Sequence, residues 1–259
     1  MNSIAILLAG GSGNRMRGTV RDKILEPLDG IPVIAHSIRA FTQADVTRSF
    51  LILCRDAGQQ EAIHAAIRPQ MDATATVRWA RGGPERQDSV LNGLEACPTG
   101  TELVFIHDTA RPLVPAAALA QLAEVAARTG GAVLAHRVKD TIKQVPPATP
   151  AGTPAALTDL DRATLWAMET PQVFHHALIL DAYRKVAREN LRVTDDVAAA
   201  VHSGHKVALV ENLLPNPKIT EPHDLAWVAF LLKNHAANPP ATKVTAGGPM
   251  RTRCQKRIR

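Results

Sequence analysis

Three glycines, Gly10, Gly11 and Gly13, follow directly on the apolar run at residues 4–9. At the carboxyl end of a buried strand, a glycine turn lets backbone N–H groups face a phosphate. Four basic residues come soon after, namely Arg15, Arg17, Arg21 and Lys23. The glycines alone fit a tight turn between a strand and a helix equally well, whereas the added cations favour a triphosphate site.

Familiar phosphate-binding and catalytic patterns do not fit this sequence. A dinucleotide fingerprint needs a third glycine where Met16 stands, and no Gly-Lys-Ser/Thr follows for a Walker loop. No Ser/His/Asp or Cys/His arrangement predicts a nucleophile with its base. The histidines show no metal-ligand spacing, so we expect no metal site built by the protein alone. His107, at the end of a predicted buried strand, fits a core residue.

The net charge of +6 comes from one end of the chain. The 259 residues include 30 Lys+Arg against 24 Asp+Glu, and the stretch 236–259 holds six basic residues and no acidic one. Residues 1–235 are therefore formally neutral. Only 3% of the residues are aromatic, and basic and aromatic residues do not interleave as in a nucleic-acid stacking platform. We expect no specific nucleic-acid partner.

Aliphatic runs alternate with helical patterns along most of the chain. Strands are predicted at residues 3–9, 49–54, 75–80, 102–107, 132–136 and 206–210. Helices are predicted at residues 33–43, 57–68, 85–97, 115–128, 176–190, 195–203 and 222–235. Most of the strands are continuous apolar runs, which is typical of parallel strands covered on both faces. The alternation predicts a three-layer α/β fold with a mostly parallel, Rossmann-like sheet and helices on both faces.

Two segments interrupt this alternation. Residues 137–165 carry several prolines beside stretches with strand character at 141–145 and 163–167, which fits a projecting β-arm or a long surface loop. Residues 236–259 are rich in Pro, Gly and Thr without apolar periodicity, which indicates a disordered tail. We therefore predict one domain over residues 1–235, including the segment 137–165, followed by the tail.

Other features concern the compartment. No apolar run approaches the roughly 20 residues that span a bilayer, and the run at residues 4–9 is too short for a signal peptide. The cysteines Cys54, Cys97 and Cys254 are widely spaced and suit a reducing environment. We expect a cytoplasmic protein without membrane contact.

Seven ordered segments carry a resemblance to a known family. They are LAGGSGNRM (8–16), then Lys23 with EPLDGIPVIAHSI (26–38), GGPERQDSVLNGL (82–94), VFIHDTARPLV (104–114), KDTIK (139–143), LWAMETPQVF (165–174), and VTDD (193–196) with NPKITEPHDL (216–225). The first two resemble the opening of nucleotidyltransferases that use sugar-phosphate-like acceptors. The others narrow the resemblance to the 2-C-methyl-D-erythritol 4-phosphate cytidylyltransferase family. One glycine loop is weak evidence, but ordered matches over about residues 4–226 are specific.

The resemblance implies an enzyme that joins CTP to methylerythritol phosphate by in-line attack on the α-phosphate and releases pyrophosphate. The attacking phosphate monoester has a second pKa of about 6 and is ionised at neutral pH, so no general base is required. Mg²⁺, or another divalent cation, would arrive with CTP. In this family the arm of one subunit embraces the other, which implies a homodimer.

The family's site residues are carried over to matching positions of this sequence. Arg15 and Lys23 match the cations that stabilise the α-phosphate and the leaving pyrophosphate. Arg162 and Lys218 match the residues that hold the acceptor phosphate. Acceptor contacts are implied for Asp108, Arg111, Thr141 and Thr194. Contacts to CTP, including selection of its base, are implied for Ala9, Gly10, Gly11, Gly13, Gly82, Gly83 and Ser89.

Several positions depart from the family pattern. Gly10 and Thr109 stand where alanine is usual, and Glu169 replaces glutamine. The usual Pro-Lys-Gln is Asp22-Lys23-Ile24, with one additional residue before the lysine, so an acid lies beside the predicted triphosphate site. None of these changes removes a charge that the reaction needs. The alternatives are a cytidylyltransferase for another polyol phosphate such as ribitol 5-phosphate, a silent nucleotide sensor, and a nucleic-acid-binding protein.

Overall fold

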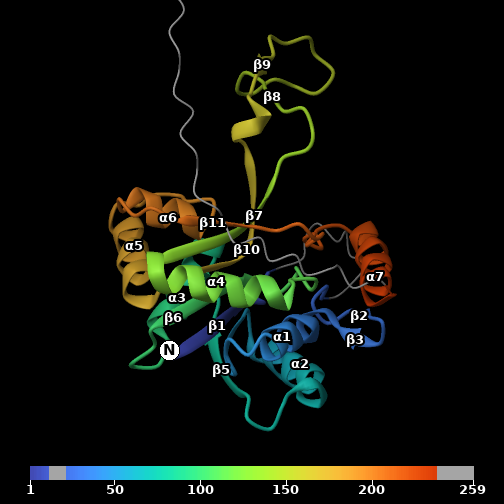
Figure 1. Ribbon diagram of the computed structural model, residues 1–259, viewed down its shortest axis with the longest axis vertical. Coiled ribbons are helices and arrows are strands. Elements are labelled where there is room, and N and C mark those ends of the chain that lie inside the picture. Colours follow the sequence, from blue (N-terminus) through green and yellow to red (C-terminus); the bar gives the residue numbers. More distant parts are fainter. Residues whose placement is uncertain (12–21, 238–259) are drawn as a thin grey trace, which may run out of the picture.

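The computed structural model describes residues 1–11 and 22–237, which form a three-layer α/β structure (Figure 1). The central sheet has seven strands in the order β11-β7-β10-β6-β1-β4-β5. These strands are β1 (Ser3–Leu8), β4 (Ser49–Cys54), β5 (Thr76–Arg81), β6 (Leu103–Asp108), β7 (Gly131–Arg137), β10 (Trp166–His175) and β11 (Ala208–Glu211). The predicted fold class is confirmed.

The direction of the strands gathers loops at one edge of the sheet. β1 pairs in parallel with β4 and β6, β4 with β5, and β11 with β7, whereas β10 is antiparallel to both β6 and β7. Leu8 is in register with Asp108 on one side and with Leu53 on the other. The segments that follow β1, β4 and β6 therefore meet at the same edge.

Helices cover both faces of the sheet (Figure 1). One face is covered by α1 (Val33–Gln43), α2 (Ala57–Ile67) and α4 (Ala116–Thr129), and the other by α3 (Arg86–Glu95), α5 (His176–Arg188) and α6 (Asp196–His202). On the first face, Phe41 packs edge-on against Phe50 and Phe105, with ring centroids 6.3 and 5.5 Å apart. Because both faces are buried, the central strands need the continuous apolar runs seen in the sequence.

A third, smaller core lies beside the sheet. Here α7 (Pro222–Ala237) packs near the short strands β2 (Pro27–Leu28) and β3 (Ile31–Pro32). Leu28, Ile219 and Val228 are buried in it. Because Ile219 directly follows Lys218, this core fixes the segment that carries Lys218 to the edge of the sheet.

An arm projects from the sheet between β7 and β10 (Figure 1). It contains β8 (Lys143–Gln144), β9 (Thr158–Asp159) and the short 3₁₀ helix η3 (Arg162–Thr164). β8 and β9 form an antiparallel pair. The predicted β-arm is confirmed, whereas the strand expected at residues 163–167 is correct only at its last two residues. Residues 162–164 form a helical turn, and Trp166 and Ala167 already belong to β10, where they pair with β7.

The sequence pattern misses β10 as a member of the central sheet. Its middle carries Glu169, Thr170, Pro171 and Gln172, so no apolar run marks it. The register with β7 shifts between Met168 and Gln172, which accommodates the proline. The buried Gln172 has its own partner, because its Nε2 donates to Asp195 Oδ2 at 3.0 Å. Only the tertiary partners of these polar groups make this segment a buried strand.

Some predictions fall outside the described residues. Gly13 and Arg15 belong to residues 12–21, and the predicted tail falls almost entirely within residues 238–259. The last helix, α7, continues two residues past its predicted end at 235. In the described ranges, no helix combines the length and the apolar character needed to cross a bilayer.

Candidate active site

A cavity of about 540 Å³ lies at the carboxyl ends of β1, β4 and β6. Eight of the predicted site residues line it, and these are Ala9, Gly10, Gly11, Lys23, Gly83, Ser89, Asp108 and Lys218. They come from segments far apart in the sequence and are brought together by the strand order. The structure therefore assembles one site from the predicted glycine turns, lysines and aspartate.

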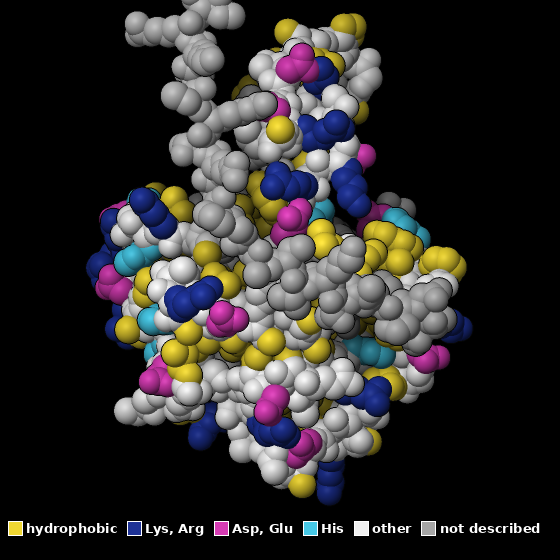
Figure 2. Space-filling model, in the orientation of Figure 1, with side chains coloured by type: hydrophobic (Ala, Val, Ile, Leu, Met, Phe, Trp, Pro, Cys, Tyr) yellow, Lys and Arg dark blue, Asp and Glu magenta, His cyan; other side chains and the backbone are white. Residues whose placement is uncertain are grey.

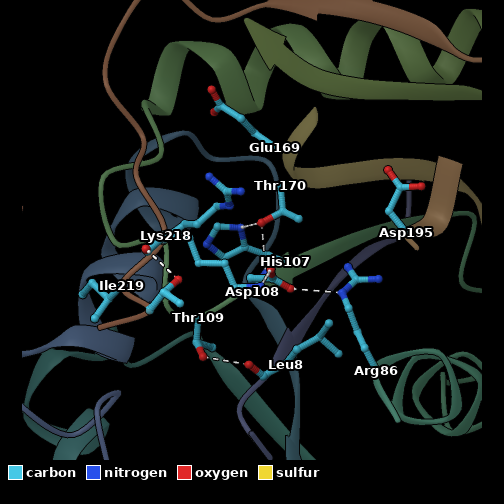
Figure 3. A network of polar contacts seen from close by, with 12 residues as sticks. Leu8, Arg86, His107, Asp108, Thr109, Glu169, Thr170, Asp195, Lys218 and Ile219 are labelled. Atoms are coloured by element: carbon cyan, nitrogen blue, oxygen red, sulfur yellow. Dashed lines mark hydrogen bonds and ion pairs between the residues drawn. The ribbon is translucent and has the colours of Figure 1, made fainter. Parts of the chain in front are cut away.

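Asp108 lies at the centre of the polar wall of this cavity (Figure 3). Its Oδ1 accepts a hydrogen bond from Arg86 Nε at 3.3 Å, and its Oδ2 accepts one from Lys218 Nζ at 2.5 Å. Burial by itself would raise the pKa of this carboxyl, but Arg86 and Lys218 outweigh burial and hold the pKa well below its usual range. Asp108 is therefore a fixed anion that can accept hydrogen bonds from hydroxyl groups.

Arg86 is itself held by a second, fully buried carboxylate. Its two Nη atoms donate to the oxygens of Asp196 at 2.8 and 2.9 Å, and the hydroxyl of Tyr183 donates to Asp196 Oδ1 at 2.5 Å. Burial opposes the charge on Arg86, but Asp196 and Asp108 together raise its pKa above the ordinary value. The bidentate pair fixes the guanidinium and leaves Nε to face Asp108. The sequence pattern gives no signal for this pair, because its members lie 110 residues apart.

Three contacts hold the segment that carries Lys218. Arg111 Nη1 donates to the carbonyl of Asn216 at 2.7 Å, and the N–H of Ile219 donates to the carbonyl of Ala110 at 2.8 Å. Asn216 Nδ2 in turn donates to Glu169 Oε2 at 2.8 Å. Arg111, predicted to contact substrate, thus supports Lys218 from behind the cavity wall, and burial lowers its pKa.

Glu169 anchors the same segment from β10. It is 3% exposed, and it accepts hydrogen bonds from Asn212 Nδ2 and Asn216 Nδ2 at 2.9 and 2.8 Å. Its other oxygen lies 2.5 Å from Nδ1 of His136. A carboxylate in place of the family's usual glutamine is therefore matched by donors at both of its oxygens.

His107 belongs to the layer beneath Asp108. Its ring lies 3.1 Å from the hydroxyl of Thr170 and 3.2 Å from the hydroxyl of Ser37, and the same Thr170 hydroxyl accepts the N–H of Asp108 at 3.1 Å. Burial lowers the pKa of His107 to about 4. The prediction of a core histidine is confirmed, since this neutral side chain is fully buried.

Lys23 enters the cavity from a turn at the end of the glycine loop. Its Nζ donates to the carbonyl of Ile219 at 2.8 Å, which places it beside the segment of Lys218. The turn is closed by a hydrogen bond from the N–H of Leu25 to the carbonyl of Asp22 at 3.0 Å. Two predicted phosphate-binding lysines thus converge from opposite ends of the chain.

Gly82 and Gly83 form a tight turn after β5. A Cβ atom on Gly83 would lie 2.4 Å from Cβ of Asp88, so only glycine fits there. The N–H of Gly83 donates to Ser89 Oγ at 2.9 Å, and the N–H of Gly82 donates to the carbonyl of Cys54 at 2.8 Å. The turn is therefore prebuilt, and it presents Gly83 and Ser89 to the cavity while Gly82 stays behind.

Three further predicted residues lie away from the cavity. Arg162 and Thr141 are exposed on the arm, where Arg162 Nη1 donates to the carbonyl of Lys139 at 2.6 Å. Thr194 is exposed just before α6. No group of three or more His, Cys, Asp or Glu side chains within residues 1–11 and 22–237 is placed to hold a metal ion.

The fold and the cavity together define a doubly wound α/β protein of the nucleotide-binding class. The model of the 2-C-methyl-D-erythritol 4-phosphate cytidylyltransferase family matches residues 3–234. The chain belongs to this family.

Known relatives are similar to this chain over most of its length. The 2-C-methyl-D-erythritol 4-phosphate cytidylyltransferase of Synechococcus elongatus is 39% identical over 228 residues, covering 88% of this chain and 95% of that protein. The chloroplastic one of rice is 37% identical, covering 88% of this chain and 73% of that protein. The crystal structure of the Thermus thermophilus enzyme is similar with a TM-score of 0.71 and 27% identity, covering 90% and 100% of the two chains.

Proposed function

We propose that this chain transfers the cytidylyl group of CTP to 2-C-methyl-D-erythritol 4-phosphate, forming the cytidine diphospho-alcohol of isoprenoid precursor synthesis and releasing pyrophosphate. Family membership supports the reaction class. The observation that carries the proposal is the convergence of Lys23 and Lys218 on a glycine-rimmed cavity. Two substrates that both carry phosphate need cations from two directions, and this arrangement supplies them.

The chemistry demands little proton transfer. A phosphate oxygen of the acceptor forms a bond to the α-phosphorus of CTP, and the bond from that phosphorus to the oxygen bridging it to the β-phosphate breaks. The attacking oxygen is already ionised, since the second pKa of a phosphate monoester is about 6. The site must align the two phosphates and stabilise charge. Fixed cations and an aspartate held ionised suit this task better than a titrating base would.

Lys23 is assigned to the α-phosphate and the leaving pyrophosphate, together with Arg15 of the glycine loop. The N–H groups near Gly10 and Gly11 lie at the end of β1, where they can donate to phosphate oxygens. Gly13 belongs to the same proposed contact. Small residues and the prebuilt turn at Gly83 and Ser89 leave room for a pyrimidine base and offer it backbone groups.

Lys218 is assigned to the acceptor phosphate. An ammonium group has three donors, so Lys218 can keep its contact with Asp108 and still bind a phosphate oxygen. Asp108 is then placed to accept hydrogen bonds from the acceptor's hydroxyls. Arg111 acts through the loop that it supports. Thr194, exposed just before α6, stays a proposed hydroxyl contact.

Mg²⁺ fits this site as an ion carried by CTP. The carboxylates on the described wall are Asp22, Glu85 and Asp108, and they form no ligand cluster. Magnesium binds nucleotides with one or two protein carboxylates at most, its other ligands being phosphate oxygens and water. Asp108 is the residue that would hold it, through a water bound to the ion. When bound, the ion would neutralise charge on the triphosphate.

A homodimer is proposed from the arm. Its apolar side chains Ile142, Val145, Leu157 and Leu160 are 37–58% exposed, and the arm stands clear of the body (Figure 2). Such a surface on a projecting hairpin fits burial against a second copy. Arg162 and Thr141 would then reach the acceptor site of the partner, which explains why they lie outside their own chain's cavity.

The division of the chain and its location also stay proposals. A single domain over residues 1–235 followed by a basic extension agrees with the family match, which ends at residue 234. The free cysteines Cys54 and Cys97 agree with a reducing environment such as the cytoplasm.

The test is an acceptor panel with pyrophosphate release as the readout. CTP, ATP, GTP and UTP are each paired with methylerythritol phosphate and with ribitol 5-phosphate, with and without Mg²⁺. We expect turnover only with CTP, methylerythritol phosphate and the divalent ion together. Turnover with ribitol phosphate alone would reverse the choice of acceptor, and CTP binding without any turnover would indicate a sensor.

A further inference from the structure

The carboxylate of Asp22 lies on the cavity wall, yet it is paired with a cation. Asp22 is 8% exposed, and its Oδ2 accepts hydrogen bonds from Arg55 Nη2 at 2.9 Å and from Gln59 Nε2 at 2.7 Å. An unpaired carboxylate here would repel the phosphates of a bound nucleotide. The pairing explains how an acidic residue at position 22 is compatible with a triphosphate site beside it.

Gln59 and Arg55 also contact the other end of the glycine loop. Gln59 Nε2 donates to the carbonyl of Ala9 at 2.9 Å, and Arg55 Nη1 lies 3.4 Å from the carbonyl of Gly11. The entry to the loop is thereby tied to its exit at Asp22. Lys23 is the next residue after this tie, so its backbone position depends on it.

The side chains of Arg55 and Gln59 are themselves held by further contacts. Arg55 directly follows β4, and its N–H donates to Gln59 Oε1 at 2.9 Å. Asp56 caps α2 by accepting the N–H of Gln59 at 2.7 Å and lies 3.4 Å from Nε of Arg55. The amide of Gln59, which is 3% exposed, is thus satisfied at both of its atoms.

We propose that Asp22, Arg55 and Gln59 form a clamp that positions Lys23 and the backbone of Gly10 and Gly11 for the triphosphate. Within the clamp, Arg55 cancels the charge of Asp22 so that the wall accepts a polyanion. The three are positioning residues, because they act on CTP through the loop. The inference rests on the proposed function in taking CTP as the nucleotide.

The experiment measures the Kd for CTP with Mg²⁺ by calorimetry, and the KM for CTP and for methylerythritol phosphate. In Arg55→Ala, we expect the Kd and KM for CTP to rise about tenfold or more, because removing one partner leaves a buried charge uncompensated. The KM for the acceptor should stay within about twofold. Adding Asp22→Asn should reverse most of the rise, because it removes the unpaired charge.

Arg48→Ala is the matched control. Arg48 precedes β4 at the opposite edge of the sheet and is ion-paired with Asp45 and Asp72, with a side chain 39% exposed against 34% for Arg55. Its loss should leave CTP binding unchanged. Arg55→Gln, which keeps a polar side chain, serves if Arg55→Ala does not fold.

Two results overturn the clamp: an unchanged Kd for CTP in a folded Arg55 variant, or a double variant no better than Arg55→Ala. A fall in melting temperature without a change in CTP binding has the same consequence. If the wild type binds CTP but gives no turnover, the proposed function fails while the clamp is still tested by calorimetry.

Discussion

The cavity and the arm of this molecule are built in opposite ways. In the cavity, Asp108 has a side chain 10% exposed between two cations, and Asp196 is fully buried against Arg86. On the arm, the ion pair of Lys143 and Asp159 lies in the open, with side chains 39% and 82% exposed. Pairs of acidic and basic side chains are therefore buried in the cavity and exposed on the arm.

This difference shows which of the two regions can hold its charged side chains in fixed positions. A buried ion pair fixes its members, because removing one leaves the other without a partner and without water. An exposed pair contributes little and holds little. The cavity can thus keep its charged groups in place within one chain, whereas the substrate contacts proposed for Arg162 and Thr141 depend on the proposed second copy of the chain.

The largest effect is expected at Lys23. In Lys23→Ala, kcat/KM should fall by about a thousandfold, because one preorganised cation at the developing charge is lost. The fold should stay intact, since Lys23 is only half-buried. Pyrophosphate release and circular dichroism check both points, with the exposed Lys206→Ala as the control. Activity near that of the wild type would remove Lys23 from the mechanism.

Arg86 tests whether buried pairing stabilises the cavity. In Arg86→Ala, the free energy of unfolding should fall by about 3 kcal/mol, because Asp196 is left buried without its cation. Arg184→Ala is the matched control, since its pair with Glu95 is about half-exposed and should contribute under ~1 kcal/mol. Urea unfolding measures both. Equal losses in the two variants would erase the contrast between buried and exposed pairs.

Arg162 tests whether the arm acts across subunits. In Arg162→Ala, kcat/KM should fall by about a hundredfold, because the side chain is proposed to bind the acceptor phosphate. The melting temperature should stay unchanged, because the side chain is exposed and donates only to the carbonyl of Lys139. Mixing this variant with Lys23→Ala after joint unfolding and refolding should restore activity, because one site of the heterodimer then has both residues. No recovery, with heterodimers verified by mass, would place Arg162 in its own chain's site.

His107 gives a smaller, pH-dependent effect on stability. Its pKa is about 4 in the folded chain against 6.5 for the free side chain, so the unfolded chain binds more protons as the pH falls below 6.5. Between pH 7.5 and pH 5 this group should lower the free energy of unfolding by about 2 kcal/mol. Urea unfolding at the two pH values, compared with His107→Gln, isolates the effect. An identical pH dependence in the variant would contradict it.

Local patterns in the sequence determined the fold class and the place of the site. The apolar runs located the parallel strands, and the glycine turns and basic residues located the edge where a phosphate site forms. Segments such as VFIHDTARPLV placed Asp108 directly at the end of a strand. Such local patterns are enough to locate the site, because parallel strands bring the residues that follow them to the same end of the sheet. This holds whatever contacts those residues make.

Tertiary structure alone decided how the charges are held. Arg86 with Asp196, Asn216 with Glu169, and Asp22 with Arg55 are 110, 47 and 33 residues apart. No local periodicity links such partners, so the sequence left Asp22 as an unexplained acid beside a triphosphate site. The sequence did not predict β10 as a strand of the central sheet for the same reason. The polar residues in its middle are buried only because groups distant in the sequence form hydrogen bonds with them. Burial makes each of these pairings necessary, and burial is a property of the folded chain.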